Sequence, residues 1–428
     1  MKRFFLIILL LISFSVFAQD TLIMMHYNLL NYGNNYGGCD QNTNYLGDKD
    51  DYLKTIIPFI NPDILTVNEI DCNPEIADRL LVNTLNVNGA TYFQRAEQTC
   101  YSTPYIGNML YFNSTKLSLH SQDVVTTNIR DINIYKLFYN STDLPTTNDT
   151  AFIICICTHL KAGSYPDNLV ERADETLRLM NYLDNIGLAD NYIFSGDFNT
   201  RSSSEEAFQN LVNHTNLDIR FYDPIDQLGT WHNSSSYKNI HTQSTHTSNN
   251  GCPSSGGLDD RYDFILISEN IQNGTNNIEY IADSYEAIGQ DGNHYNGALN
   301  SSPANTSVPS DVLDALYNMS DHLPIVLKLK VDKTLSIDEI QKDNFADINF
   351  NNPVIESLSL NINFKNNTKN FKVEIISLLG KQIYSQKFTI SNPVFKTTIS
   401  LSQLTNGFYF LRISEGNKHQ LVRKFVKI

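Results

Sequence analysis

The residues of this chain best suited to chemistry lie where short apolar runs of the sequence end. Asn28 ends MMHYN and Glu69 ends DILTVNE. His159 ends CICTH, and Asp197 and Asn199 end YIFSGDFN. A single Asp or Asn after a strand is usually a turn former, and a single His is usually structural. A series of such groups at successive strand ends instead indicates a site at which they meet.

Three more candidates follow downstream. Asp263 lies in RYDFIL, and Asp321 and His322 precede LPIVLKL. Because hard cations prefer carboxylate and amide oxygens, these residue types favour a site for Mg²⁺, or for Mn²⁺ or Ca²⁺, over a zinc site. The oxygen ligands expected for this cation are Asn28, Glu69 and Asp321, with Asp197 as a further candidate.

The two histidines, His159 and His322, suit proton transfer and the stabilisation of charge on a phosphate oxygen. Asp263 is available to orient one of them. The sequence has no glycine-rich phosphate loop with a lysine, which argues against phosphoryl transfer from a nucleotide. The residue types therefore indicate metal-assisted hydrolysis of a phosphoester, without an organic cofactor.

In their order along the chain these motifs resemble the endonuclease/exonuclease/phosphatase superfamily. This group includes DNase I-like nucleases, abasic-site endonucleases, inositol polyphosphate phosphatases and bacterial sphingomyelinases. The resemblance is carried by YN at 27–28, NE at 68–69, THL at 158–160, GDFNT at 196–200, RYDFIL at 261–266 and SDHLPI at 320–325. It covers residues 20–331 and implies an α+β fold, a four-layer α/β/β/α sandwich with the site at one mouth of its two packed sheets.

The resemblance also implies roles for the metal ligands and for the groups that handle water and phosphate. Glu69 would be the principal metal ligand, with Asn28 and Asp321 nearby. Asp197 would position or deprotonate the attacking water, and Asn199 would donate to the phosphate.

The histidine roles follow from the same resemblance. His322 and Asp263 would form the His–Asp pair of the family, and His159 would stabilise or protonate from the opposite side. The chain departs from the family at Asn68, where a glutamine is usual before the metal-binding Glu. A further acidic or tyrosine residue often joins such sites, and no motif selects one among Tyr101, Tyr105, Tyr111 and Glu97.

The runs that carry these residues read as strands, because each is short, rich in β-branched or aromatic residues and followed by turn formers. The expected strands are residues 21–30, 63–70, 107–112, 151–160, 191–198, 261–268 and 323–331. Residues 52–60, 168–187 and 204–214 have the amphipathic spacing of helices. Strands with helices between them favour sheets covered by helices over an all-β body. The long polar loops 233–257 and 289–309 are expected to shape a site or to be mobile.

Six cysteines are present, and their spacing does not match a zinc site. Cys155 and Cys157 alternate with isoleucines in FIICICTHL, which predicts small core side chains on one face of a buried strand. The expected disulfide partners are the four that lie near loops, with the pairing left open: Cys39, Cys72, Cys100 and Cys252.

Both ends of the chain indicate export. Residues 1–18 have the basic start, apolar run and small residues of a secretory signal peptide, and the run is shorter than the roughly 20 residues that a membrane-spanning helix needs. Residues 332–350 read as a linker, and residues 351–428 as a small β-sandwich of alternating strands. LSQLTNGFYFLRIS at 401–414 and VRKFVKI at 422–428 resemble the sorting domain of the Bacteroidetes type IX secretion system.

The sorting resemblance implies outer-membrane export with removal of the domain; a retained binding module is the alternative. We therefore expect a secreted, extracellular or cell-surface protein, a monomer without stable membrane insertion. The type IX machinery would recognise its C-terminal domain.

Charge is divided unevenly along the chain. Residues 351–428 carry eleven basic and three acidic side chains, a net charge of +8, and the preceding 350 residues carry 20 basic and 43 acidic side chains, a net charge of −23. An acidic body repels polyanions at long range, so nucleic-acid binding would need divalent cations or a local basic groove.

The leading functional hypothesis is a secreted metal-dependent phosphodiesterase, an extracellular nuclease that hydrolyses DNA or RNA by in-line attack of an activated water. The alternatives are a sphingomyelinase-like phospholipase C or a sugar-phosphate phosphatase, and, from another class, a catalytically inactive adhesion module. Trp231 is either packed in its loop or a stacking platform for a base or headgroup. DGNHYN at 291–296 is predicted to be a polar loop rather than part of a two-metal phosphoesterase site.

Overall fold

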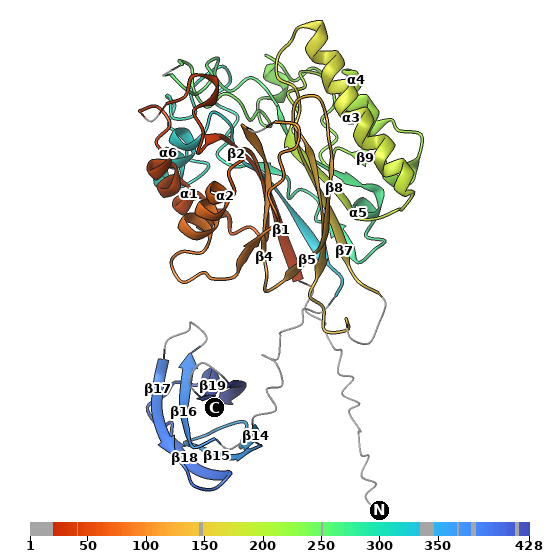
Figure 1. The fold of residues 1–428 in the computed structure, drawn as a ribbon. Helices are drawn as coiled ribbons and strands as arrows, with labels where there is room; N and C mark the ends of the chain where they lie inside the picture. The colour runs from red at the N-terminus through yellow and green to blue at the C-terminus, as the bar shows by residue number, and fades with distance from the viewer. Residues whose placement is uncertain are drawn as a thin grey trace, which may run out of the picture. The chain divides into compact units, whose positions relative to one another are not determined.

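The computed structural model divides the chain into two compact units, residues 1–335 and 336–428 (Figure 1). It describes residues 20–40, 42–103, 105–144, 149–249, 251–333, 346–365, 368–377, 382–415 and 419–428. The predicted signal peptide, and most of the predicted linker, lie outside the described residues.

The first unit contains two sheets, and the first of them carries the amino-terminal part of the site. Its strand order is β11-β13-β1-β2-β4-β3, with β12 paired to β13. The strands are β1 (Asp20–Tyr32), β2 (Ile64–Asp71), β3 (Phe93–Arg95), β4 (Ile106–Asn113), β11 (Ile278–Tyr280), β12 (Glu286–Ala287) and β13 (Ile325–Val331). Because β1 and β2 pair in parallel, with Asn28 opposite Asn68, the site residues at their ends share one edge of the sheet.

The second sheet brings three further site residues to neighbouring positions. Its order is β5-β6-β7-β8-β10-β9. β7 and β8 are parallel with His159 opposite Asp197, and β10 is antiparallel to β8 with Asp263 opposite Asp197. The strands are β5 (Leu117–Val125), β6 (Ile132–Tyr139), β7 (Phe152–His159), β8 (Tyr192–Asp197), β9 (Phe221–Tyr222) and β10 (Asp263–Ser268).

Helices cover the outer face of each sheet, as Figure 1 shows. α1 (Leu46–Ile60), α2 (Pro74–Leu80) and α6 (Ser310–Met319) share the core of the first sheet, and α3 (Pro166–Ile186) and α4 (Glu206–Val212) share that of the second. The remaining short elements are α5 (Glu269–Asn273), the 3₁₀ turns η1 (Tyr36–Gly38), η3 (Leu217–Ile219) and η4 (Ser235–Tyr237), and the π turn η2 (Leu81–Leu85).

Strand β7 shows how the layers pack. Cys155 and Cys157 lie in the core between the two sheets, and Ile154 and Ile156 lie in the core shared with α3. The two sheets therefore pack face to face with helices outside, which confirms the predicted four-layer α/β/β/α sandwich. The two free cysteines are buried, as expected from their alternation.

The sequence-based prediction missed several elements, among them β5, β6, α2 and α6. β5 is an edge strand with mostly exposed or half-buried polar side chains, so it lacks the apolar alternation by which a strand is recognised. The disulfides are Cys39–Cys252 and Cys72–Cys100, which confirms the predicted partners and resolves their pairing.

The second unit is a β-sandwich, as predicted. One sheet has the order β14-β15-β18 and the other β17-β16-β19-β20. In β15 every second side chain, from Leu358 to Phe364, is buried in the core between the sheets. The strands are β14 (Ala346–Phe350), β15 (Ser357–Phe364), β16 (Asn370–Ser377), β17 (Gln382–Thr389), β18 (Val394–Ser400), β19 (Gly407–Glu415) and β20 (His419–Lys427).

Among the described residues of both units, none of the helices is long and apolar enough to cross a membrane.

Candidate active site

Two irregular strand ends position the first acidic group. Pairing between β1 and β2 shifts register after Asn28, and pairing between β2 and β4 shifts between Asn68 and Ile70. Glu69, at this shift, has a φ of 57°, in the left-handed region. A bulge re-aims the side chain it carries. One carboxylate oxygen of Glu69, Oε2, accepts a hydrogen bond from the backbone N–H of Asn31 at 3.1 Å.

His159 and Asp197 complete a compact group with Glu69. His159 Nε2 lies 3.5 Å from Asp197 Oδ2 and 3.8 Å from Glu69 Oε1. One atom from each of the three lies within 4.8 Å of the others, and the three side chains come from β2, β7 and β8. The parallel pairing of β7 with β8 explains this, because it sets His159 and Asp197 side by side.

His322 approaches the same aspartate from the other side. Its Nδ1 lies 2.7 Å from Asp263 Oδ2 and its Nε2 lies 3.6 Å from Asp197 Oδ2. The hydroxyl of Thr242 donates to the same Asp263 oxygen at 2.6 Å. All four side chains are buried. The predicted His322–Asp263 pair and the predicted water-positioning Asp197 thus meet in one buried cluster.

Asn28 lies between the acids with its amide nitrogen toward them. Its Nδ2 donates to Glu69 Oε1 and to Asp197 Oδ2, both at 3.1 Å, while its Oδ1 accepts from the backbone N–H of Leu30. This orientation differs from the expectation of an oxygen ligand. In this orientation Asn28 links the two carboxylates. A ligand role would require its side-chain amide to flip, so that Oδ1 rather than Nδ2 faces the acids.

Asp321 lies close to His322 but outside the compact group of Glu69, His159 and Asp197. Its Oδ1 is 4.0 Å from His322 Nε2. The other oxygen, Oδ2, accepts from the backbone N–H of Ser254 at 2.9 Å and from Gln243 Nε2 at 3.2 Å. Oδ1 is buried and has no hydrogen-bond partner among the described residues. A buried carboxylate oxygen left in this state is suited to a cation.

Asn199 follows Asp197 in a left-handed turn, with a φ of 52°. Its backbone N–H donates to Asp197 Oδ1 at 3.0 Å, and its side-chain amide donates to the carbonyl of Leu160 at 3.3 Å. Asn199 therefore helps to orient Asp197, and its half-buried side chain lies beside the strand end that carries His159.

Burial and neighbouring charges shift the pKa values of the residues in the cluster in different directions. Burial raises the pKa of Asp197 to about 7; the negative charges of Asp263 and Glu69 add to the rise, and His322 opposes it. Burial acts to lower the pKa of His322, but the carboxylates of Asp263 and Asp197 outweigh it and raise that pKa well above its ordinary value. Burial, with the charge of Arg130, lowers the pKa of His159 well below its ordinary value. One histidine is therefore held protonated and the other neutral.

Sequence reasoning missed several residues that hold the site together. Asn68, noted only as a departure from the family, accepts the backbone N–H of Asp197 at 2.8 Å and donates to Asn108 at 2.7 Å. Gln243 Nε2 lies 2.7 Å from His322 Nε2. Thr242 and Gln243 belong to the polar loop 233–257, so loop length was the available signal. Lys49, from α1, donates to the carbonyls of Leu29 and Leu30, both at 2.6 Å.

The other residues singled out in the sequence lie elsewhere or already form hydrogen bonds. Trp231 is fully buried and its indole N–H donates to the carbonyl of Gln227, so its reading as a stacking platform is wrong. His294 of DGNHYN is buried and bonded to Asp291 and to loop carbonyls, which confirms the polar loop. Tyr111 is buried with its hydroxyl on the carbonyl of Ala77. Tyr101 and Tyr105 are exposed.

The donor set fits a divalent cation. Glu69, His159 and Asp197 offer ligand atoms within one small region, and Asp321 adds an unpartnered buried oxygen. Carboxylates outnumber histidines in this set, which suits Mg²⁺ or Mn²⁺ better than a soft metal. Among the described residues one other His–Asp group has similar spacing, formed by His232, Asp259 and Asp260.

The comparisons with known proteins bear on the two units separately. Residues 350–428 match the family model described as "Secretion system C-terminal sorting domain". This match confirms the predicted sorting domain and indicates export to the cell surface or beyond. No curated protein matches the chain.

Solved structures similar to this chain include members of the superfamily named on its motifs. An endonuclease/exonuclease/phosphatase family protein from Bacteroides thetaiotaomicron is 12% identical, with a TM-score of 0.44, over 74% of this chain and 97% of that one. The human Nocturnin catalytic domain is 15% identical, with a TM-score of 0.43, over 73% and 97%. D. rerio TDP2 complexed with a single-strand DNA product is 14% identical, with a TM-score of 0.43, over 72% and 99%. The roles of individual residues follow from the geometry of this chain.

Proposed function

We propose that the first unit is a divalent-metal-dependent phosphodiesterase that acts after export, as an extracellular nuclease that hydrolyses DNA or RNA. The observation that carries the proposal is the buried meeting of the His322–Asp263 pair with Asp197, which His159 and Glu69 flank on the other side. An adhesion module would have no use for such a cluster, because burying several carboxylates beside a single protonated histidine costs stability.

Glu69 and Asp321 would hold the cation, with Asp197 and His159 in reach of it. When bound, it would supply Lewis-acid neutralisation of phosphate charge. Asp197 would accept the proton of the attacking water, since burial raises the pKa of this carboxyl and makes it a stronger base. Protonated His322, oriented by Asp263, would donate a hydrogen bond to developing negative charge, and His159 would do so from the opposite side. The water oxygen would bond to phosphorus while its proton passes to Asp197; the bond from phosphorus to the ester oxygen would break, and the leaving oxygen would take up a proton from solvent.

The expected place of the enzyme supports a nucleic acid as the substrate. The sorting domain would bring it to a compartment in which released polynucleotides are available to it. Recognition of the sorting domain by the type IX machinery belongs to the same proposal. The net charge of −23 on residues 1–350 favours the second candidate, a phosphatase or phospholipase C-like enzyme with a small phosphoester substrate.

The test is release of acid-soluble nucleotides from DNA and RNA by the exported protein, with Mg²⁺ and with a chelator, beside a His322→Ala variant. Release that requires the metal and is lost in the variant supports the nuclease. Hydrolysis of bis(p-nitrophenyl) phosphate or sphingomyelin without release of nucleotides would support a phosphodiesterase whose substrate is not a nucleic acid. The absence of any hydrolysis would overturn the proposal.

A further inference from the structure

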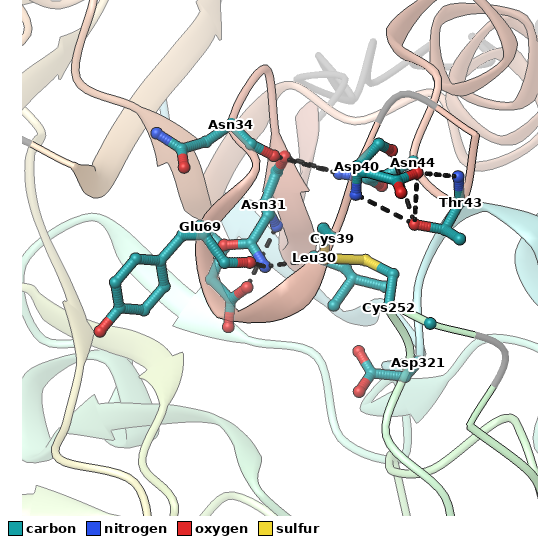
Figure 2. Close-up of a disulfide and its surroundings, with 12 residues drawn as sticks. Leu30, Asn31, Asn34, Cys39, Asp40, Thr43, Asn44, Glu69, Cys252 and Asp321 are labelled. Atoms are coloured by element: carbon teal, nitrogen blue, oxygen red, sulfur yellow. Dashed lines mark hydrogen bonds between the residues drawn. A yellow bond between two sulfur atoms is a disulfide. The ribbon is translucent and has the colours of Figure 1, made fainter.

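The Cys39–Cys252 disulfide lies beside the two carboxylates expected to hold the cation, as Figure 2 shows. It joins the segment that runs from the end of β1, where Asn31 lies, through Cys39 to a loop 213 residues further along the chain. Each of the two joined segments donates one backbone N–H to one of these carboxylates. Asn31 N–H donates to Glu69 Oε2 at 3.1 Å, and Ser254 N–H donates to Asp321 Oδ2 at 2.9 Å.

On the Cys39 side, the connection from sulfur to carboxylate is short. The side-chain amide of Asn31 donates to Cys39 Sγ at 3.3 Å and to the carbonyl of Tyr36 at 3.2 Å. The backbone N–H of the same Asn31 reaches Glu69. Asn31 therefore connects the disulfide to the metal carboxylate through one residue, and its φ of 54° keeps this turn in the left-handed region.

On the Cys252 side, Ser254 is two residues from the sulfur. Its N–H is one of two donors to Asp321 Oδ2 among the described residues, the other being the half-buried Gln243 amide. Its carbonyl accepts the hydroxyl of Ser244 at 2.7 Å. The described residues from 251 to 262 form no helix or strand, and the disulfide ties this loop to the segment that carries Cys39.

Backbone N–H groups that donate to ligating carboxylates fix their orientation, and loss of such contacts typically costs 10- to 100-fold in metal affinity. We propose that the Cys39–Cys252 disulfide, acting through Asn31 and Ser254, positions Glu69 and Asp321 for the divalent cation, so that opening it with a dithiol weakens cation binding. In this step the dithiol gives two electrons and two protons, the protein S–S bond becomes two thiols, and the reductant becomes a disulfide. The inference rests on the proposed function.

A functional consequence follows for export. In a reducing compartment the two cysteines are thiols, and the carboxylates lose the fixed donors that the disulfide secures. The cation affinity would then rise only after oxidation outside the cell, so the hydrolase would be latent before export.

The second disulfide provides the matched control. Cys72–Cys100 lies in the same unit and closes a separation of 28 residues. Among the described residues, no hydrogen bond joins Cys72 or Cys100, or the residues next to them, to Glu69 or Asp321. Its loss removes a crosslink without removing the two N–H donors.

The experiment is calorimetric titration of the whole exported protein with Mn²⁺, a readout separate from turnover, on the wild type and two double variants. Cys39→Ser/Cys252→Ser should weaken Mn²⁺ binding about 10- to 100-fold. Cys72→Ser/Cys100→Ser should leave it within about twofold. Equal Mn²⁺ affinity in all three proteins would overturn the inference while hydrolysis by the wild type still upheld the proposed function. A wild type that neither binds Mn²⁺ nor hydrolyses a phosphodiester would overturn both.

One further variant and a stepwise reduction of the wild type keep the test decisive if the cysteine variant does not fold. Asn31→Gly retains the backbone donor and tolerates the positive φ, but loses the side-chain link to Cys39. It should weaken Mn²⁺ binding about threefold to tenfold in the oxidised protein, and reduction with dithiothreitol should weaken it further. Wild-type protein reduced in steps, with each disulfide followed by alkylation and mass spectrometry, should lose Mn²⁺ affinity in proportion to opening of Cys39–Cys252. Loss that tracks Cys72–Cys100 instead would contradict the assignment.

Discussion

Two buried carboxylates, one in each unit, are compensated in opposite ways, although the first unit also contains ion pairs to buried carboxylates, such as Arg79–Asp50. In the second unit Glu374 is buried in β16 and pairs with Arg412, its cross-strand neighbour, at 2.7 Å and with Lys372 at 2.6 Å. In the first unit Glu175 of α3 is equally buried, and it accepts a hydrogen bond from the backbone N–H of Lys161. Among the described residues no Lys or Arg lies within ion-pair distance of Glu175.

The same contrast holds at the candidate active site. The carboxylates of Glu69, Asp197, Asp263 and Asp321 have histidine neighbours but, among the described residues, no Lys or Arg at ion-pair distance. Compensated charge in the second unit is structural, because its partners are present in the fold. At the candidate active site four carboxylates share one protonated histidine, His322, and the excess negative charge marks a place where a cation or a proton must come from outside.

The largest expected effect is on turnover. His322→Ala removes the group that faces both Asp197 and Asp263 and should reduce hydrolysis by about 10² to 10⁴-fold. Steady-state rates with Mg²⁺ measure it, and circular dichroism checks the fold. Arg412→Ala, which breaks the ion pair of the second unit, serves as the control and should leave turnover unchanged. Turnover of His322→Ala close to that of wild type would remove the histidine from the mechanism.

The next effect is on the pH dependence of stability. Burial raises the pKa of Glu175 to about 7 from its unfolded value, so the folded state binds this proton more tightly than the unfolded state does. Its contribution is fully present below about pH 4.5 and is lost as the pH rises toward 7. Glu175→Gln should therefore be more stable than wild type at pH 8, by up to about 3 kcal/mol, and equal to it at pH 4. Denaturant unfolding at both pH values measures this; equal stability of the two proteins at pH 8 would contradict it.

For Glu374 we expect the opposite dependence of stability on pH. The hydrogen bond from Arg412, with that from Lys372, lowers the pKa of Glu374. Its stabilising contribution is present above the unfolded pKa of the carboxyl and is lost as the pH falls through the folded value. Glu374→Gln should thus cost stability at pH 7 and cost little at low pH, the reverse of Glu175→Gln.

A smaller effect is expected from the metal itself. If a cation relieves the repulsion among the uncompensated carboxylates, Mn²⁺ at a hundred times its Kd should stabilise the first unit by about 2.7 kcal/mol. Calorimetric unfolding of the whole protein measures it. The transition of the second unit should not move, since its carboxylate already has its partners. A uniform shift of both transitions would show that Mn²⁺ acts without a site.

The smallest effect is on the second unit. Arg412→Ala leaves Glu374 with Lys372 alone and should lower the stability of that unit by about 1 to 2 kcal/mol, because both basic side chains are partly exposed. Thermal unfolding followed in the exported protein measures the change. An unchanged transition would mean that Lys372 alone compensates the buried carboxylate.

Features set by neighbouring residues could be predicted from the sequence, whereas features set by residues far apart in the chain could not. The alternation in β7 and β15 predicted which side chains are buried, because a strand places successive side chains on opposite faces whatever surrounds it. β5 escaped prediction because polar residues at an edge carry no such pattern. The ordered motifs identified the site residues. Strand pairing, however, is what places His159 and Asp263 beside Asp197.

By itself the sequence determined the fold class, the two-sheet core, the sorting domain and the residue types available for chemistry, since these follow from local period and motif. Tertiary structure decided which cysteines pair, which way the Asn28 amide faces and that Thr242 and Gln243 reach His322. It also decided that His322 and His159 have pKa values shifted in opposite directions. The reason is physical: burial and charge at a site are sums over groups from many strands, and no local stretch of sequence contains that sum.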